Sequence, residues 1–272
     1  MDASEYNFKR CKLCGEMTAG STYDLTDSTI YTCLNCDFHF LNRLDNHSEK
    51  LINTVQLDEK SREYIESRLD ESAHLHPKRL EFVQKHIDLC GCKALDIGAG
   101  LGQFQLLLQT QGAEVQGIEP SHIRKEYAQE KFGINLHSKL VDSDYWQAGF
   151  SQHFDLITLW DVIEHVNFPR ETLLAAIKLL KSGGFLFLDT PSREVLSYKL
   201  SQQLYRFSSG KMRLFLPSFY STASYGHKQI FTQKQLINLL EELGLEIIST
   251  AHSYTAHLFS ENKIILACRK TV

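Results

Sequence analysis

From residue 93 onward, short apolar runs alternate with longer segments in which apolar and polar positions are mixed. Short apolar runs are typical of buried strands, and longer mixed segments are typical of amphipathic helices. The pattern predicts strands over 93–97, 114–118, 134–138, 155–160 and 185–189. It predicts helices over 101–111, 121–131 and 169–181, the last ended by Gly183 and Gly184. Strands that alternate with helices in this way indicate an α/β fold.

The chain before this alternation divides into two further parts. Residues 46–88 are charged and helix-friendly, and Pro77 interrupts them, so we expect two helices that link the parts on either side. Residues 1–45 hold four of the seven cysteines. We therefore expect a small cysteine-containing module over 1–45, a helical linker over 46–88 and the main domain over 89–272.

The four N-terminal cysteines form two pairs, Cys11-x-x-Cys14 and Cys33-x-x-Cys36. An odd total and this pairing argue against the disulfide framework of a secreted protein. Two such pairs at this separation are typical of a zinc ribbon, in which four thiolates surround one ion. Four protein ligands leave no open position for chemistry, so the expected zinc is structural. A pair of redox motifs is the alternative.

Charge and hydropathy exclude some classes of protein. The formal net charge is −4, and residues 1–45 hold seven acids against four bases, which disfavours nucleic acid as a partner and RNA methylation as an activity. No apolar run is long enough to span a membrane, and MDASEYNFKR is too polar for a secretory signal. The expected localisation is cytoplasmic, with peripheral membrane contact left open.

A glycine-rich segment follows the first predicted strand. It reads Asp96-Ile97-Gly98-Ala99-Gly100-Leu101-Gly102, and an acid, Glu119, follows the second predicted strand. Glycines allow backbone to approach a ligand closely, and a carboxylate accepts both hydroxyls of a ribose. These features predict an adenosine-ribose site, which suits either NAD or S-adenosylmethionine, although the glycine spacing weakens the case for a nicotinamide oxidoreductase.

Two later segments distinguish the cofactors. The chain continues with FDLITLWDVIEHV at 154–166 and with a Gly-Gly turn before the fifth predicted strand. Together with the glycine loop and Glu119, these segments resemble class I S-adenosylmethionine-dependent methyltransferases, in the branch of ubiquinone-biosynthesis and sugar methyltransferases. The resemblance implies a Rossmann-like sheet of seven strands, with 244–250 and 263–269 as a C-terminal antiparallel pair.

The resemblance also implies roles for particular residues. The glycine loop would approach the methionine portion of S-adenosylmethionine, Glu119 would bind the ribose, and Asp142 would accept from the adenine amino group. The cofactor-binding residues expected on this basis are Asp96, Gly98, Ala99, Gly100, Gly102, Glu119, Pro120, Leu140, Val141, Asp142, Trp160 and Asp161.

Two histidines are candidates for the methyl-transfer step. A base that removes the proton of an acceptor hydroxyl assists methyl transfer, and the ordinary pKa of histidine, about 6.5, suits that role. His165 follows Glu164 just past the fourth predicted strand, and His227 precedes a helix expected to start near Thr232. Glu164 beside His165 also leaves open a divalent metal at the acceptor.

The segment 193–228 is expected to form a mobile cap that selects the acceptor. It holds six bases against one acid, a formal charge of +5, with aromatic residues interleaved. Such a segment suits a small anionic acceptor such as a nucleotide-linked sugar. A lipid or quinone precursor at a membrane surface is the alternative, and a solvated helical lid without a charge role is another.

Overall fold

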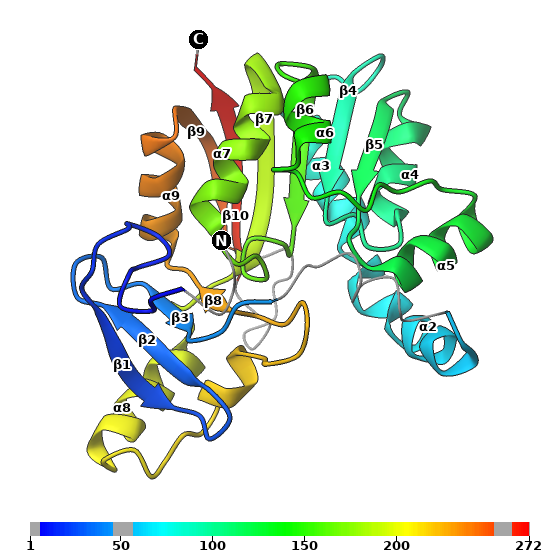
Figure 1. Cartoon of the computed structure of the whole chain (residues 1–272). Coiled ribbons are helices and arrows are strands. Elements are labelled where there is room, and N and C mark those ends of the chain that lie inside the picture. The colour runs from blue at the N-terminus through cyan, green and yellow to red at the C-terminus, as the bar shows by residue number, and fades with distance from the viewer. Residues whose placement is uncertain (1–5, 46–56, 253–262, 272) are drawn as a thin grey trace.

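Two sheets organise the chain (Figure 1). The structure is a computed structural model that describes residues 6–45, 57–252 and 263–271. The larger sheet has six strands in the order β5-β4-β6-β7-β10-β9, and the smaller has four in the order β1-β2-β3-β8. Strands β5, β4, β6 and β7 run parallel, and β10 is antiparallel to both of its neighbours. Residues 1–5 of the expected N-terminal module and 46–56 of the expected linker lie outside the described residues.

The strands of the larger sheet are β4 (Lys93–Ile97), β5 (Glu114–Ile118), β6 (Phe154–Trp160), β7 (Leu180–Pro191), β9 (Leu245–Ala251) and β10 (Lys263–Lys270). The helices around it are α2 (Glu59–Ala73), α3 (His76–Gln84), α4 (Gln103–Thr110), α5 (His122–Phe132), α6 (Asp144–Gly149), α7 (Pro169–Leu179) and α9 (Gln233–Glu242). Pro77 lies in the first turn of α3, where its missing N–H costs nothing.

Helices cover both faces of the larger sheet (Figure 1), and this explains why its central strands β4 and β6 are mostly apolar and buried, whereas the edge strands β5 and β9 are partly polar. Successive side chains of a strand point to opposite faces. Ala94 and Leu156 belong to a core shared with α3 and α4, whereas their neighbours Leu95 and Ile157 belong to a core shared with α6, α7 and α9. A strand buried on both sides has no polar face, which is the pattern that β6 displays.

The expected third strand, 134–138, is wrong, so the sheet has six strands rather than seven. A single parallel bridge joins His137 to Ile118 at the sheet edge. Gly133 caps α5 with φ of 68°, and the N–H of Ile134 donates to the carbonyl of Ala128 in that helix. The end of α5 therefore uses the N–H of Ile134, which is unavailable for a longer run of pairing with β5.

The expected end of the third helix is also wrong. Helix α7 ends at Leu179, and Gly183 and Gly184 lie inside β7. The register of β7 against β6 shifts between the pairs Phe154–Leu180 and Leu156–Phe185. Gly183 has φ of 75°, so the glycines accommodate an irregular stretch of strand rather than a helix end.

The smaller sheet joins distant parts of the chain. Its strands are β1 (Ala19–Asp24), β2 (Thr29–Cys33), β3 (His39–Leu41) and β8 (Gln229–Ile230), so residues 6–45, here called the ribbon, share a sheet with a segment that follows the expected cap. The cap forms α8 (Leu196–Phe207) and a 3₁₀ turn over Leu216–Phe219. Figure 1 shows α8 against the blue ribbon strands, and Tyr198 and Leu216 of the cap share a core with Tyr23 and Ile30.

The cap is thus packed on the ribbon, and its expected mobility stays a prediction. Within 6–45, 57–252 and 263–271, no helix combines the length and the apolar character that crossing a bilayer requires.

Candidate active site

The loop between β4 and α4 carries three glycines, all with positive φ: 72° at Gly98, 58° at Gly100 and 75° at Gly102. A Cβ on Gly98 would lie 2.4 Å from the Val162 side chain, and one on Gly102 would lie 2.7 Å from Ile134. Packing therefore excludes a side chain at these two positions. Gly100 has open space before it, so the backbone there is free to approach a ligand.

Asp96 lies near the end of β4, directly before this loop. Its side chain is buried and accepts a 2.6 Å hydrogen bond from Oγ1 of Thr158 on β6. Burial raises the pKa of Asp96 to about 7, because the charged carboxylate is poorly solvated there. Asp96 therefore ties the end of β4 to the neighbouring strand.

Glu119 follows β5 and is held in one orientation. Its Oε2 accepts from the N–H of Gly100 and its Oε1 from the N–H of Ser121, both at 2.9 Å. The side chain is almost fully buried, and burial raises its pKa. A carboxylate offers about four lone-pair sites, so two of them remain for a ligand.

Two cavities meet along this edge of the sheet. The first, here called the Glu119 cavity, has a volume of about 360 Å³, and the second, here called the Arg79 cavity, about 280 Å³. Gly98, Arg124, Asp161 and His165 line both. Other expected cofactor residues divide between them: Glu119, Pro120, Leu140, Val141 and Asp142 line the first, and Asp96, Ala99, Gly100 and Trp160 line the second. Of the residues expected at the site, Gly102, Glu164 and His227 line neither.

Sequence reasoning missed the contribution of the linker helices. Tyr64 and Ile65 of α2 and His76 and Arg79 of α3 line the Arg79 cavity. Arg79 is only 2% exposed and forms a two-pronged pair with Asp189 at the end of β7. The only signal in the sequence is a basic residue on the inward face of α3, which composition alone does not distinguish from a surface arginine.

Asp161 lies where the two cavities meet. Nη2 of Arg79 donates to its Oδ2 at 2.6 Å, and Nζ of Lys263 on β10 donates to its Oδ1. Burial opposes the charge of Asp161, but Lys263 and Arg79 outweigh burial and lower its pKa to about 2. The wall of the site therefore carries a carboxylate that stays ionised.

The structure brings together the three residues that the sequence singles out for the methyl-transfer step. One ligand atom each from Glu164, His165 and His227 lie within 4.8 Å of one another, close enough to hold one divalent cation. The two imidazole rings have centroids 4.7 Å apart, and Nε2 of His165 is 3.8 Å from Oε1 of Glu164. The other oxygen of Glu164 accepts from Oγ1 of Thr190 at 2.9 Å.

Burial controls the protonation of this group. It lowers the pKa of both His165 and His227, and it raises the pKa of Glu164 to about 7 with help from the nearby Asp161 charge. Both imidazoles are therefore expected to be neutral at pH 7, the form in which histidine accepts a proton.

Three bases of the cap bind the ribbon instead of lining the Glu119 and Arg79 cavities. Each forms an ion pair with an aspartate of residues 6–45, and one of them, Lys228, is fully buried. The pairs are Arg193 with Asp37, Arg213 with Asp24 and Lys228 with Asp45. The structure thus differs from the expectation that the positive charge of the cap meets an anionic acceptor.

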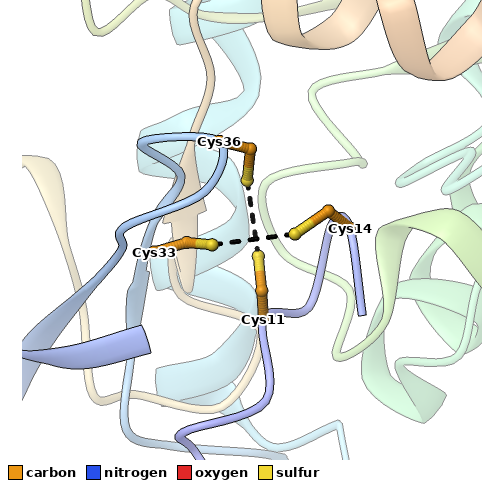
Figure 2. Close-up of side chains that lie close together, drawn as sticks. All are labelled: Cys11, Cys14, Cys33 and Cys36. Carbon is orange, nitrogen blue, oxygen red and sulfur yellow. Dashed lines mark hydrogen bonds between the residues drawn. The ribbon is translucent and has the colours of Figure 1, made fainter. Parts of the chain in front are cut away.

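The four ribbon cysteines converge on one point, as Figure 2 shows. Their Sγ atoms lie within 4.8 Å of one another, and Cys11–Cys36 and Cys14–Cys33 are each separated by 3.6 Å. Zn–S bonds of about 2.3 Å in a tetrahedron place sulfurs about 3.8 Å apart. The donor set and its spacing therefore fit a zinc ion.

Residues 57–250 match a family model described as a methyltransferase domain. The chain belongs to this methyltransferase family. It is an S-adenosylmethionine-dependent enzyme, and the glycine loop, Glu119 and the two cavities stand at the edge of the sheet where open α/β sheets bind ligands. The match begins after the ribbon, so the four-cysteine cluster lies outside it.

Curated relatives of the methyltransferase share one name. It is 26% identical to the ubiquinone biosynthesis O-methyltransferase of Colwellia psychrerythraea over 219 residues. The aligned region covers 72% of this chain and 85% of the relative. The enzyme of that name from Thiobacillus denitrificans is 32% identical over 130 residues, 47% of this chain and 56% of the relative.

Solved structures support the fold of the methyltransferase. A putative S-adenosylmethionine-dependent methyltransferase from Listeria monocytogenes has a TM-score of 0.56 at 16% identity and covers 75% of this chain and 100% of its own. The magnesium protoporphyrin IX methyltransferase of Synechocystis, solved with bound SAH, has a TM-score of 0.53 at 14% identity and covers 83% of this chain and 93% of its own.

Proposed function

We propose that the methyltransferase transfers a methyl group from S-adenosylmethionine to a hydroxyl oxygen of a small, lipid-like aromatic acceptor. The observation that carries the cofactor assignment is Glu119, whose carboxylate is fixed by two backbone N–H groups and borders the Glu119 cavity. The name shared by the relatives supports oxygen as the methylated atom. The test is methyl transfer to a catechol, described at the end of the Discussion.

In this proposal the residues at the sheet edge position the cofactor. Glu119 accepts from the ribose hydroxyls, Leu140 and Val141 flank the adenine, and Asp142 accepts from its amino group. Asp161 would lie at the methionine end, where Arg79 and Lys263 hold its carboxylate in place. When bound, S-adenosylmethionine supplies a methyl group on a positively charged sulfur.

The acceptor is assigned to the side on which His165 and His227 lie. A neutral His165 would take the proton from the acceptor hydroxyl, and the methyl group would pass to the oxygen as its bond to the cofactor sulfur breaks. Proximity and alignment supply much of the acceleration in such a displacement, so the walls that hold the acceptor matter as much as the base.

The surface of the cap supports a membrane-associated acceptor over a nucleotide-linked sugar. Six large hydrophobic side chains of the cap are exposed, and Phe207 is 86% and Leu196 81% exposed. The other four are Leu200, Met212, Leu214 and Phe215. Residues 196–215 include four bases and no acid, and one of the four, Arg213, pairs with Asp24 of the ribbon. An apolar and basic surface of this kind suits the headgroup region of an anionic bilayer.

We expect the wild-type chain to sediment with vesicles that contain phosphatidylglycerol, and salt is expected to weaken that binding. The double variant Leu200→Ser/Phe207→Ser removes two apolar side chains from the surface. It is expected to bind the vesicles at least about tenfold more weakly, because each buried methylene contributes about 0.8 kcal/mol. Leu174→Ser, an exposed position on α7, is the control and is expected to bind as wild type. Equal binding by the double variant would contradict a membrane-facing cap.

We also propose that Cys11, Cys14, Cys33 and Cys36 hold one structural zinc ion. Four thiolates fill a tetrahedral site, so the ion would fix the two cysteine pairs to each other and take no part in methyl transfer.

Metal analysis of the purified chain is expected to give about one zinc per chain. Cys11→Ser removes one of four ligands and is expected to lower the zinc content and the melting temperature, whereas Cys90→Ser, at an exposed position, is expected to change neither. A folded ribbon without metal in the wild-type chain would overturn the assignment.

A further inference from the structure

Asp45, at the end of the ribbon, lies between two loops of the candidate active site. Its Oδ2 accepts from the backbone N–H of Tyr225 at 2.9 Å and from Nζ of Lys228 at 3.1 Å. Its own backbone N–H donates to Oδ1 of Asn167, and Nδ2 of Asn167 donates back to its carbonyl, both at 2.8 Å. One residue of the ribbon thus binds both loops.

Both loops border the candidate active site. Residues 163–168 carry His165, and residues 221–229 carry Tyr225 and His227; His165 and Tyr225 line the Glu119 cavity. The N–H groups of Lys228 and Gln229 donate to the carbonyl of Glu164 at 2.8 and 3.3 Å. The relative position of the two histidines therefore depends on how these loops meet.

Gln229 strengthens the same junction. Its Nε2 donates to the carbonyl of Ile163 at 2.9 Å and to that of Val166 at 2.6 Å, so a side chain of β8 spans the loop that carries His165. Strand β8 in turn pairs with β3, the strand of the ribbon that precedes Asp45 in the chain. The ribbon consequently contacts the acceptor side through a strand and through a buried aspartate.

The chemistry of Lys228 shows that its charge has a positioning role. The side chain is fully buried, and its ammonium donates to Asp45 and to the carbonyls of Ala223 and Gly226, both at 3.0 Å. An ammonium has three protons, and these three acceptors match them. The 223–226 turn therefore folds around the Lys228 ammonium, and among the described residues Asp45 is the carboxylate that pairs with it.

We propose that Asp45 is a positioning residue for methyl transfer, which holds the His165 loop and the His227 loop in register with each other. The proposal rests on the proposed function as far as it concerns turnover, but the loop geometry stands independently of it. Glu119 and the glycine loop bind one another without Asp45, whereas His165, Asn167 and Tyr225 also line the Glu119 cavity, so the loss of turnover is expected to exceed the loss of cofactor affinity.

Asp45→Asn tests this, with Asp27→Asn as the matched control at an exposed ribbon position. Amide hydrogen exchange in 221–229 is expected to be at least about tenfold faster in Asp45→Asn, since a charged acceptor of two hydrogen bonds is lost. S-adenosylmethionine affinity, measured by calorimetry, is expected to fall only a few-fold, while kcat for a catechol acceptor falls at least about tenfold. Asp45→Glu is expected to recover part of the rate, and Asp27→Asn to match wild type throughout.

A second variant covers the case in which Asp45→Asn does not fold because it leaves a buried ammonium without a counter-charge. Asp45→Asn/Lys228→Met removes both charges and is expected to fold with the same fast exchange in 221–229. Unchanged exchange in either folded variant would overturn the proposal, as would an equal loss of S-adenosylmethionine affinity and of kcat. Fast exchange together with a wild-type chain that methylates no catechol would support the loop geometry and reject the proposed function instead.

Discussion

Glu119→Ala is expected to lower the affinity for S-adenosylmethionine by at least about 30-fold. Two ribose hydroxyls lose their acceptor, at about 1–3 kcal/mol each, and about 1.4 kcal/mol corresponds to a factor of ten. The N–H groups of Gly100 and Ser121 lose their acceptor as well, so the glycine loop is also expected to loosen. Calorimetric titration with S-adenosylmethionine gives the affinity directly.

Two further variants sharpen this result. Glu119→Gln keeps one carbonyl acceptor and is expected to lie between wild type and Glu119→Ala, and Glu114→Ala, at the exposed start of the same strand, is expected to bind as wild type. If Glu119→Ala bound S-adenosylmethionine as tightly as wild type, the ribose assignment would be wrong.

His165→Ala is expected to reduce turnover by about 100-fold or more while S-adenosylmethionine affinity changes only a few-fold. A positioned general base contributes about 10²- to 10⁴-fold to the rate of such a step. His153→Ala, at the opposite end of β6, is the control and is expected to have little effect. Equal losses of turnover and affinity would instead identify His165 as a residue that supports the cofactor site.

The pH dependence provides a second readout for His165. Burial lowers its pKa below the ordinary value of about 6.5, so the neutral, proton-accepting form is populated at pH 7. Turnover is therefore expected to be level from neutral pH upward and to fall as the pH drops through that lowered pKa. A rate that rises on acidification would contradict a basic role.

Local patterns predicted the strands that the larger sheet depends on. The runs 93–97 and 114–118 match the bounds of β4 and β5. Strand β4 is buried from Ala94 to Ile97 and leaves a strong apolar signal, whereas β5 is buried only at Gly117 and Ile118. The run 134–138 carries a similar signal, since Ile134 and Leu136 are buried, but they are buried under α4 and α5 at the sheet edge. The hydrophobicity of a segment indicates that it is buried, but it does not indicate which helix or strand buries it.

The candidate site was predictable where its residues follow one another in the chain. The glycine loop, Glu119 and the segment 160–165 belong to consecutive strand ends, and the structure places them around the two cavities. Arg79 and Lys263 were missed because they reach Asp161 from a linker helix and from the antiparallel strand β10. Their role depends on tertiary pairing, for which the sequence carries no periodic signal.

The charge of the cap illustrates the same limit. Its excess of bases stood out against an acidic chain, and a ligand was the simplest explanation. The ribbon, with seven acids against four bases over 1–45, supplies the partners: Arg193 and Lys228, for example, bind Asp37 and Asp45. A positive segment and a negative segment of one chain can neutralise each other, which composition alone does not distinguish from binding an anionic ligand.

Methyl transfer to an alkyl-substituted catechol in phosphatidylglycerol vesicles, with isotope-labelled S-adenosylmethionine, tests the central claim most directly. Mass spectrometry is expected to find the labelled methyl group on a catechol oxygen, at one product per S-adenosylmethionine consumed, with the rate about 100-fold or more lower in His165→Ala and little changed in His153→Ala. A chain that binds S-adenosylmethionine but methylates a nucleoside diphosphate sugar and leaves the catechol unmodified would contradict the proposal.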